Sequence, residues 1–204
     1  MITVPVTESE GASTSTLEWP HHLLTLDDWA ELPETSEFHV EVVEGVLAVS
    51  PRPFFFHRRS IARITYVLDE QLAPGFSAGN EVELLLNEVP PTVRVPDVPV
   101  TSASVADQNP ARVRAEDALL VVEILSEGTK RTDQVTKHFE YADAGIEHYW
   151  IIDLDAPVSM ITYRLVDGDY ENFGEHSGKV ELDVAGMPVV LDLDALIAGR
   201  VQKP

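Results

Sequence analysis

The chain of 204 residues contains no cysteine, which excludes disulfide bonds, thiolate zinc sites, iron–sulfur clusters and cysteine nucleophiles. Long hydrophobic runs are also missing, because nowhere do about eighteen apolar residues follow one another. Residues 1–20 lack the basic segment and the apolar segment of a signal peptide. We therefore expect a cytoplasmic protein that does not cross a membrane.

Basic residues are scarce as well. The 14 Lys and Arg are outnumbered by 35 Asp and Glu, which gives a net charge of -21 at pH 7. A protein that binds nucleic acid through its phosphates usually presents a basic face, so this charge argues against broad phosphate contact. A local basic patch is compatible with the sequence, since no acidic residue interrupts the cluster of Arg52, Arg58, Arg59 and Arg63.

The composition is otherwise that of a globular protein, with 44% apolar and 24% charged residues, and the length favours one domain. Residues 1–17 are rich in Thr, Ser and Glu and show little periodicity, which predicts a flexible acidic leader. We expect residues 18–204 to form the single domain.

Hydrophobic periodicity predicts the first elements. Thr25 is a suitable N-cap for a short helix that ends near Pro33. Alternation with period two predicts a hairpin of residues 38–43 and 46–49 around a turn at Glu44-Gly45. Helical spacing predicts helices at 57–72 and 131–144, and the second would bury a face formed by Val135, Phe139 and Ala142.

The remaining pattern is rich in strands. We expect them at 80–87, 93–100, 118–125, 148–153, 158–165, 169–174 and 179–184, with a last short helix around 193–197. Segment 118–125 is apolar except for one residue, as is typical of a central strand covered on both faces. The order of elements predicts an α/β or α+β fold with a mixed sheet.

The charged residue in that central strand is Glu123. A carboxylate inside an apolar strand costs several kcal/mol unless it is paired, protonated or bound to a cation. A second acid, Asp97, follows Pro96 between valines in another strand-like stretch. Mg²⁺ and Mn²⁺ prefer carboxylate and carbonyl oxygens, so Asp97, Glu123 and the main-chain carbonyl of Ile124 are candidate metal ligands.

Two further charged residues belong to this hypothesis. Lys137 lies on the helix after the central strand, where its side chain could return to the strand end and stabilise negative charge that develops on a phosphate. Glu41, in the first strand of the hairpin, could supply another carboxylate.

Several stretches of the sequence together resemble a known family. They are Glu41 to Gly45, Ser50-Pro51 with His57, Val95 to Asp97, Val122 to Ser126 with Thr129, Asp133 and Lys137, and Tyr141 to Asp153. Over residues 25–197 the chain is similar to the bacterial Uma-two family of endonucleases, members of the PD-(D/E)XK nuclease superfamily.

The resemblance implies a restriction-endonuclease-like core, a mixed β-sheet flanked by helices, and a homodimer. It also implies that Asp97 and Glu123 are metal ligands, Lys137 is the catalytic lysine and Glu41 is an accessory acid. The superfamily pattern has its lysine two residues after the acid, where this chain has Leu125. The family resemblance therefore moves the lysine to the next helix.

Each candidate residue also has a structural explanation. Glu123 could form an internal salt bridge with Lys137 or an arginine, and Asp97 could be an ordinary turn or strand-end residue. Lys137 could form an exposed pair with Asp133. His57 and Arg58 are candidates for substrate contact, although a histidine near a helix start is more often a cap or a surface residue.

We expect divalent-metal-dependent hydrolysis of phosphodiester bonds in nucleic acid, most readily DNA, with Mg²⁺ or Mn²⁺ as the cofactor. Two alternatives stay open. One is a catalytically inactive binding or assembly module on the same fold, which the net charge of -21 favours. The other is a metal-dependent hydrolase of a small phosphodiester, which would need no broad basic face.

Overall fold

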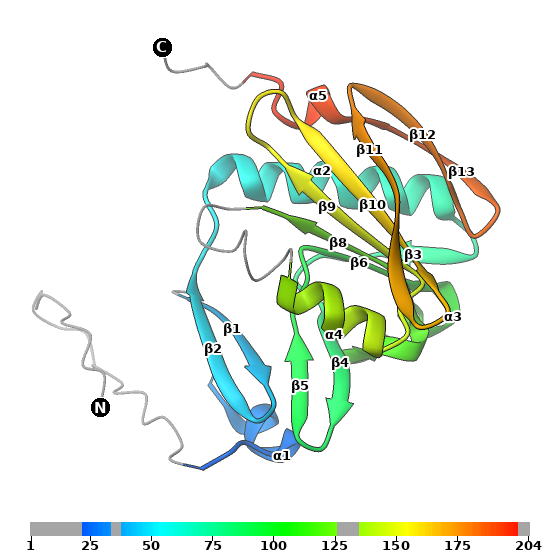
Figure 1. Ribbon diagram of the computed structural model, residues 1–204. Coiled ribbons are helices and arrows are strands. Elements are labelled where there is room, and N and C mark those ends of the chain that lie inside the picture. The colour runs from blue at the N-terminus through cyan, green and yellow to red at the C-terminus, as the bar shows by residue number, and fades with distance from the viewer. Residues whose placement is uncertain (1–21, 34–37, 126–134, 200–204) are drawn as a thin grey trace, which may run out of the picture.

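The computed structural model describes residues 22–33, 38–125 and 135–199 (Figure 1). The leader predicted at 1–17 lies outside the described residues. Among the helices that are described, none is long and apolar enough to span a membrane.

A six-stranded mixed sheet forms the centre of the fold, in the order β11-β10-β9-β8-β6-β3. The strands are β3 (Phe76–Ala78), β6 (Val98–Ser102), β8 (Ala118–Ile124), β9 (His148–Asp153), β10 (Ser159–Val166) and β11 (Asp169–Ser177). The predicted central strand is β8, which pairs antiparallel with β6 and parallel with β9. All seven of its residues are buried, because both faces of the sheet are covered.

Helix α2 (Phe55–Leu72) covers one face, together with the hairpin of β12 (Lys179–Val184) and β13 (Met187–Asp192) and helix α5 (Leu193–Leu196). The core on this side contains Ile64 and Leu68 of α2 and Leu120 and Val122 of β8. Helix α4 (Lys137–Asp143) lies on the opposite face, where its Tyr141 joins a second core (Figure 1).

A second, five-stranded sheet has the order β2-β1-β5-β4-β7. Its strands are β1 (Phe38–Val43), β2 (Val46–Pro51), β4 (Glu83–Glu88), β5 (Pro91–Arg94) and β7 (Arg112–Arg114). The predicted hairpin is confirmed, and both turn residues have positive φ, 49° at Glu44 and 78° at Gly45. Glycine suits the second position, since other residues rarely adopt a φ of 78° and a Cβ there would lie only 3.1 Å from the carbonyl oxygen of Leu24.

Most of the other predicted elements are also confirmed. Helix α1 (Leu26–Glu31) has the predicted N-cap, Thr25, which forms a capping box with Asp28. The elements that the pattern did not predict are short or weakly patterned: β3, β7, β13, helix α3 (Ala103–Ala106) and the 3₁₀ helix η1 (Ala115–Asp117).

The single strand predicted at 93–100 is wrong. The segment is two strands in two different sheets, with β5 ending at Arg94 and β6 beginning at Val98. Pro96 cannot donate a main-chain hydrogen bond to a sheet, and it lies in the break between them. Asp97 is therefore placed where the chain passes from one sheet to the other.

The buried face predicted for the helix at 131–144 is also wrong in part. Ala142 is buried, but Val135 is exposed and the Phe139 side chain is 60% exposed. The face that turns inward carries Lys137 and Tyr141, which are one helical turn apart and both buried. Polar groups occupy this face because they find a partner, Glu123, on the sheet.

Candidate active site

Glu123 lies at the end of the central strand and is only 3% exposed. Its Oε1 accepts hydrogen bonds from the Nζ of Lys137 and from the hydroxyl of Tyr141, both at 2.8 Å. Strand β8 points this side chain towards α4, on the same face as Val121 and Leu125, which belong to the core around Tyr141. The two residues on α4 thus stabilise a carboxylate that would be costly to bury alone.

Glu41 of β1 approaches the same lysine from the second sheet. Its Oε1 lies 3.7 Å from the Nζ of Lys137, and this oxygen also accepts a hydrogen bond from the main-chain N–H of Val95 at 3.0 Å. Its Oε2 accepts a bond of 2.8 Å from Nη1 of Arg94. Lys137 therefore lies between two buried carboxylates, one from each sheet.

Arg94 connects the second sheet to α4. Its Nε and Nη2 donate to the two carboxylate oxygens of Glu140, each at 2.7 Å, in addition to its bond with Glu41. Such a two-point contact between guanidinium and carboxylate fixes orientation as well as distance. Because Glu140 is one helical turn from Lys137, this contact holds the helix that carries the lysine.

The pKa values of these groups follow from burial and charge. Burial raises the pKa of the Glu41 carboxyl, but the charges of Lys137 and Arg94 and the hydrogen bonds from His39 and Val95 outweigh it, so the pKa lies well below its ordinary value. Burial, with the nearby charges of Glu123 and Glu41, raises the pKa of the Tyr141 hydroxyl, which remains a hydrogen-bond donor.

Asp97 adds a third carboxylate, at the end of the strand that carries Glu123. Its Oδ2 accepts a bond of 2.7 Å from the main-chain N–H of Ile124, the residue after Glu123. Its Oδ1 lies 3.0 Å from Nε2 of His57, in the first turn of α2. Asp97 consequently joins the end of β8 to the start of α2.

The predicted residues are therefore brought together in large part. Glu123, Lys137 and Glu41 form one buried network, and Asp97 and His57 adjoin it through the main chain of Ile124. The suggestion that Lys137 is an exposed residue is wrong, because it is buried. Asp133, its suggested partner, lies outside the described residues.

Arg58 is not part of this network. Its side chain is exposed, and Nη2 lies 3.8 Å from Glu81, which also accepts a bond from Arg52. Arg63 donates to the main-chain carbonyl of Leu196, and Arg59 lies over the ring of Phe56. The arginine cluster is thus partly neutralised or directed towards the protein itself.

Three members of the network were missed by sequence reasoning: Arg94, Glu140 and Tyr141. Arg94 stands in an apolar stretch between Val93 and Val95, and a buried arginine needs an acidic partner, so this signal was available. Nothing in the local pattern identified Glu140 as the partner of Arg94 or Tyr141 as the partner of Glu123.

The carboxylates suit a hard divalent cation in chemical type, since Asp97 and Glu123 offer oxygen donors at adjoining strand ends. Within residues 22–33, 38–125 and 135–199, however, no three His, Asp or Glu side chains are grouped to hold a metal ion. A site would therefore combine the two carboxylates with main-chain oxygen and water.

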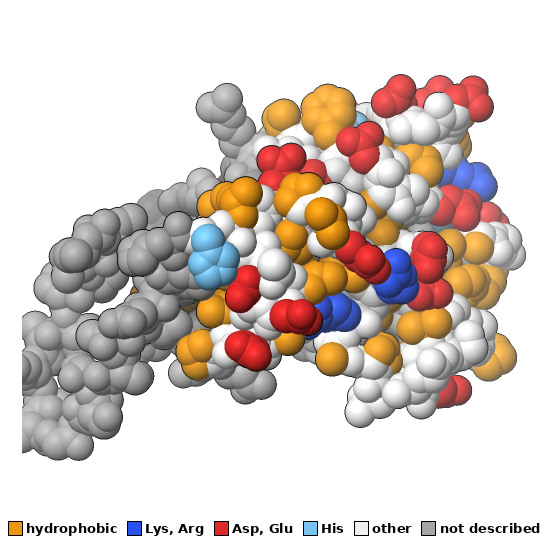
Figure 2. Space-filling view, turned by 90° about the horizontal axis from the view of Figure 1, so that it is seen from below, with side chains coloured by type: hydrophobic (Ala, Val, Ile, Leu, Met, Phe, Trp, Pro, Cys, Tyr) orange, Lys and Arg blue, Asp and Glu red, His pale blue; other side chains and the backbone are white. Residues whose placement is uncertain are grey.

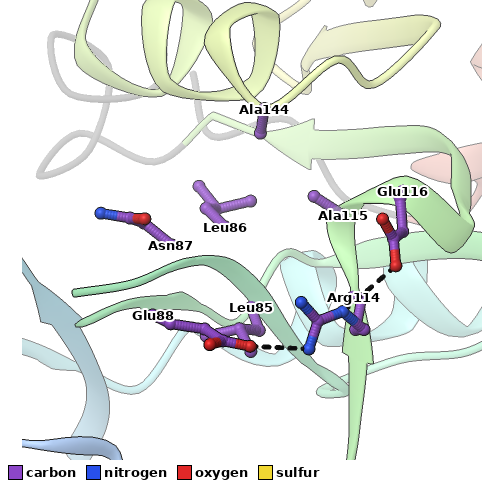
Figure 3. A pocket seen from close by; sticks show the side chains of 8 residues that line it. All are labelled: Leu85, Leu86, Asn87, Glu88, Arg114, Ala115, Glu116 and Ala144. Atoms are coloured by element: carbon purple, nitrogen blue, oxygen red, sulfur yellow. Dashed lines mark hydrogen bonds and ion pairs between the residues drawn. The ribbon is translucent and has the colours of Figure 1, made fainter. Parts of the chain in front are cut away.

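A pocket of about 350 Å³ lies elsewhere, between β4, η1 and the end of α4 (Figure 3). Leu86, Asn87 and Ala144 are among its lining residues, and none of the predicted site residues lines it. Its Arg114 is held by Glu88 at 2.8 Å and by Glu116 at 3.2 Å (Figure 3). This pocket thus contributes nothing to the carboxylate network.

Comparison with known structures shows the class of fold. The chain is similar to the crystal structure of "a putative nuclease belonging to DUF820" from Anabaena variabilis, with a TM-score of 0.65 and 22% sequence identity. The similarity covers 86% of this chain and 98% of that chain. The protein thus has the mixed α/β fold of this structure, with two mixed sheets, as the sequence predicted.

The family follows from the sequence match. Residues 26–195 match the model of the Uma2 family, whose description is "Putative restriction endonuclease". The protein therefore belongs to the Uma2 family, and the resemblance seen in the sequence is confirmed. A comparison with curated proteins gave no match.

Proposed function

We propose that the protein is a divalent-metal-dependent endonuclease that hydrolyses phosphodiester bonds in DNA. The observation that carries the proposal is the buried contact of Glu123 with Lys137, next to Asp97 at the Ile124 main chain. Family membership supports the same class of reaction.

Asp97 and Glu123, with the main-chain carbonyl of Ile124, would hold Mg²⁺ or Mn²⁺. When bound, the cation supplies a Lewis acid that favours ionisation of water and offsets the charge of the phosphate. The oxygens of Asp97 now accept bonds from His57 and from the Ile124 N–H, so cation binding would replace at least one of these contacts.

Lys137 would stabilise the negative charge that develops on the phosphate during hydrolysis. Its ammonium group is held by Glu123 at 2.8 Å and faces Glu41 at 3.7 Å. Tyr141 orients Glu123, while Arg94 and Glu140 hold the strand and helix that carry the site. These three are positioning residues in the proposal.

The test is cleavage of plasmid and of single-stranded DNA with Mg²⁺ or Mn²⁺ by the purified protein. Glu123→Gln keeps the shape of the side chain and its bond with Tyr141 but removes the charge, so cleavage should fall by at least about 100-fold. Glu171→Gln, an exposed acid on β11, is the matched control and should cleave like the unchanged protein. Equal cleavage by the Glu123 variant and the unchanged protein would count decisively against the proposal.

A catalytically inactive binding module is the second candidate. It is favoured by the ion pair of Glu123 with Lys137 and by the net charge of -21. Calorimetric titration with Mn²⁺ separates the two candidates. If the protein is an inactive module, the heat of Mn²⁺ binding should not depend on Asp97. If it is a metal-dependent enzyme, Asp97→Asn should abolish that heat.

A further inference from the structure

Two arginines from different elements converge on the carboxylate of Glu81. Its Oε1 accepts a hydrogen bond of 3.2 Å from Nη1 of Arg52, and Nη2 of Arg58 lies 3.8 Å from the same oxygen. Arg52 directly follows β2, and Arg58 lies in the first turn of α2. Guanidinium groups bind carboxylate and phosphate oxygens with the same geometry, so an arrangement that holds this carboxylate also suits a phosphate.

This ion pair lies beside the proposed active site. The histidine that precedes Arg58 in α2 places its Nε2 3.0 Å from Oδ1 of Asp97. The loop that carries Glu81 is held from the other side, because the main-chain N–H of Gly79 donates a hydrogen bond of 3.0 Å to the carbonyl of Pro99. Pro99 is two residues after Asp97. Both partners of the ion pair are therefore anchored next to a candidate metal ligand.

The ion pair is of a kind that exchanges easily. The side chains of Arg58 and Glu81 are 53% and 50% exposed, and an exposed ion pair contributes little to stability because water and salt screen it. Glu81 also has a φ of 54°, a left-handed conformation that glutamate rarely adopts, so backbone preference does not hold it there. A phosphate that approaches the two arginines can therefore take the place of the carboxylate.

The charge of the rest of the protein limits phosphate contact to a few places. The face in Figure 2 carries acidic side chains over much of its area, with only small basic areas among them. With a net charge of -21, binding that depends on a broad basic face is disfavoured. Phosphate contact is left to arginines whose acidic partner can give way.

We propose that Arg52 and Arg58 form a subsite for a phosphate of the DNA backbone, and that the Glu81 carboxylate occupies this subsite when no strand is bound. The inference rests on the proposed function for its link to hydrolysis, and it names a residue that limits substrate binding at that site. Because the carboxylate competes with the phosphate, removal of its charge should strengthen binding.

Binding is measured by fluorescence anisotropy, with the full chain in EDTA and a labelled DNA oligonucleotide at about 0.1 M salt. Glu81→Gln keeps the size of the side chain and removes its charge. One additional phosphate contact at this salt concentration corresponds to about eight-fold tighter binding. We therefore expect Glu81→Gln to bind about five- to ten-fold more tightly than the unchanged protein. Its affinity should also depend more steeply on salt, by about 1 in the slope of log affinity against log salt.

Glu88→Gln is the matched control, since it removes the same charge from an exposed ion pair elsewhere, with Arg114 at 2.8 Å. The Glu88 side chain is 56% exposed, close to the value for Glu81. Its affinity for DNA should change by less than about two-fold, because no phosphate subsite is opened. Glu81→Gln/Arg58→Ala should lose the gain in affinity, since a guanidinium group of the subsite is then missing.

Circular dichroism checks that each variant is folded. Glu81→Asn is the second variant, because asparagine tolerates the left-handed φ at this position, and it should show the same gain as Glu81→Gln.

Equal gains in Glu81→Gln and Glu88→Gln would overturn the proposal, because net charge alone would then explain them. So would a gain that survives Arg58→Ala, or no measurable binding in Glu81→Gln. A gain that depends on Arg58, without any cleavage in Mn²⁺, supports the subsite and contradicts the nuclease. Cleavage that depends on Glu123 but is the same in Glu81→Gln at low DNA concentration does the reverse.

Discussion

Replacement of Lys137 by methionine tests the central ion pair most directly. Methionine keeps much of the length and apolar volume of lysine but removes the charge, and Glu123 then loses the Lys137 ammonium group at 2.8 Å. Two unit charges at that distance attract by about 6 kcal/mol with an effective dielectric constant of about 20. Desolvation offsets part of this attraction, and removal of one member of a buried pair usually costs about 3–5 kcal/mol.

We expect Lys137→Met to lower the free energy of unfolding by about 3 kcal/mol, towards the smaller end of that range. The reason is that Tyr141 still donates a hydrogen bond to Glu123, and Glu41 still has Arg94. The double variant Lys137→Met/Glu123→Gln removes both charges, so it should be more stable than the sum of the two single changes predicts, by about 2 kcal/mol.

The assay is urea unfolding at pH 7 followed by far-ultraviolet circular dichroism, with the slope of the transition compared between variants. A cost below about 1 kcal/mol for Lys137→Met with an unchanged slope would refute the reasoning, because the pair would not be buried as described. Additive effects in the double variant would refute it as well, since they would show that the two side chains do not interact.

Three further changes probe the surroundings of the pair and one local element. Glu41→Gln should make the free energy of unfolding fall less steeply in acid, because the pKa of Glu41 is lowered in the folded protein. The stability that ionised Glu41 contributes is complete above about pH 5 and is lost as the pH falls towards the folded pKa. Unfolding series at successive pH values measure this difference. Arg94→Lys should cost about 2 kcal/mol, because lysine cannot make the two-point contact with Glu140, and an unchanged melting temperature would contradict this. Thr25→Ala removes the capping box with Asp28 and should cost about 1 kcal/mol in the same urea assay, while no loss would show that α1 does not unfold with the rest.

Local sequence pattern was a reliable guide where a segment's own residues decide its surroundings. The run from Ala118 to Leu125 predicted a doubly covered strand, and β8 is buried along its whole length. The Glu44-Gly45 turn and the Thr25 cap were predicted for the same reason, since a turn or a cap depends on a few neighbouring residues.

Local pattern failed where distant parts of the chain set the environment. Residues 93–100 have the pattern of one continuous strand. Their first half belongs to β5, which pairs with β1 and β4, and their second half belongs to β6, which pairs with β3 and β8. In α4 the apolar residues Val135 and Phe139 were expected inside, but Lys137 and Tyr141 take that place because Glu123 stabilises them there. Whether an apolar or a polar face is buried depends on the partner that faces it.

For the candidate site, the amino-acid pattern alone predicted a buried carboxylate at Glu123, because an acid within an apolar strand can be recognised without knowing which segments pack against it. The groups that surround this carboxylate follow from how distant segments pack together. Arg94 is 53 residues from Glu41 and 46 from Glu140, and these contacts arise when two sheets and a helix pack together. Periodicity predicts which face of a segment is buried. Whether a buried charge on that face is compensated depends on which other segments pack against it.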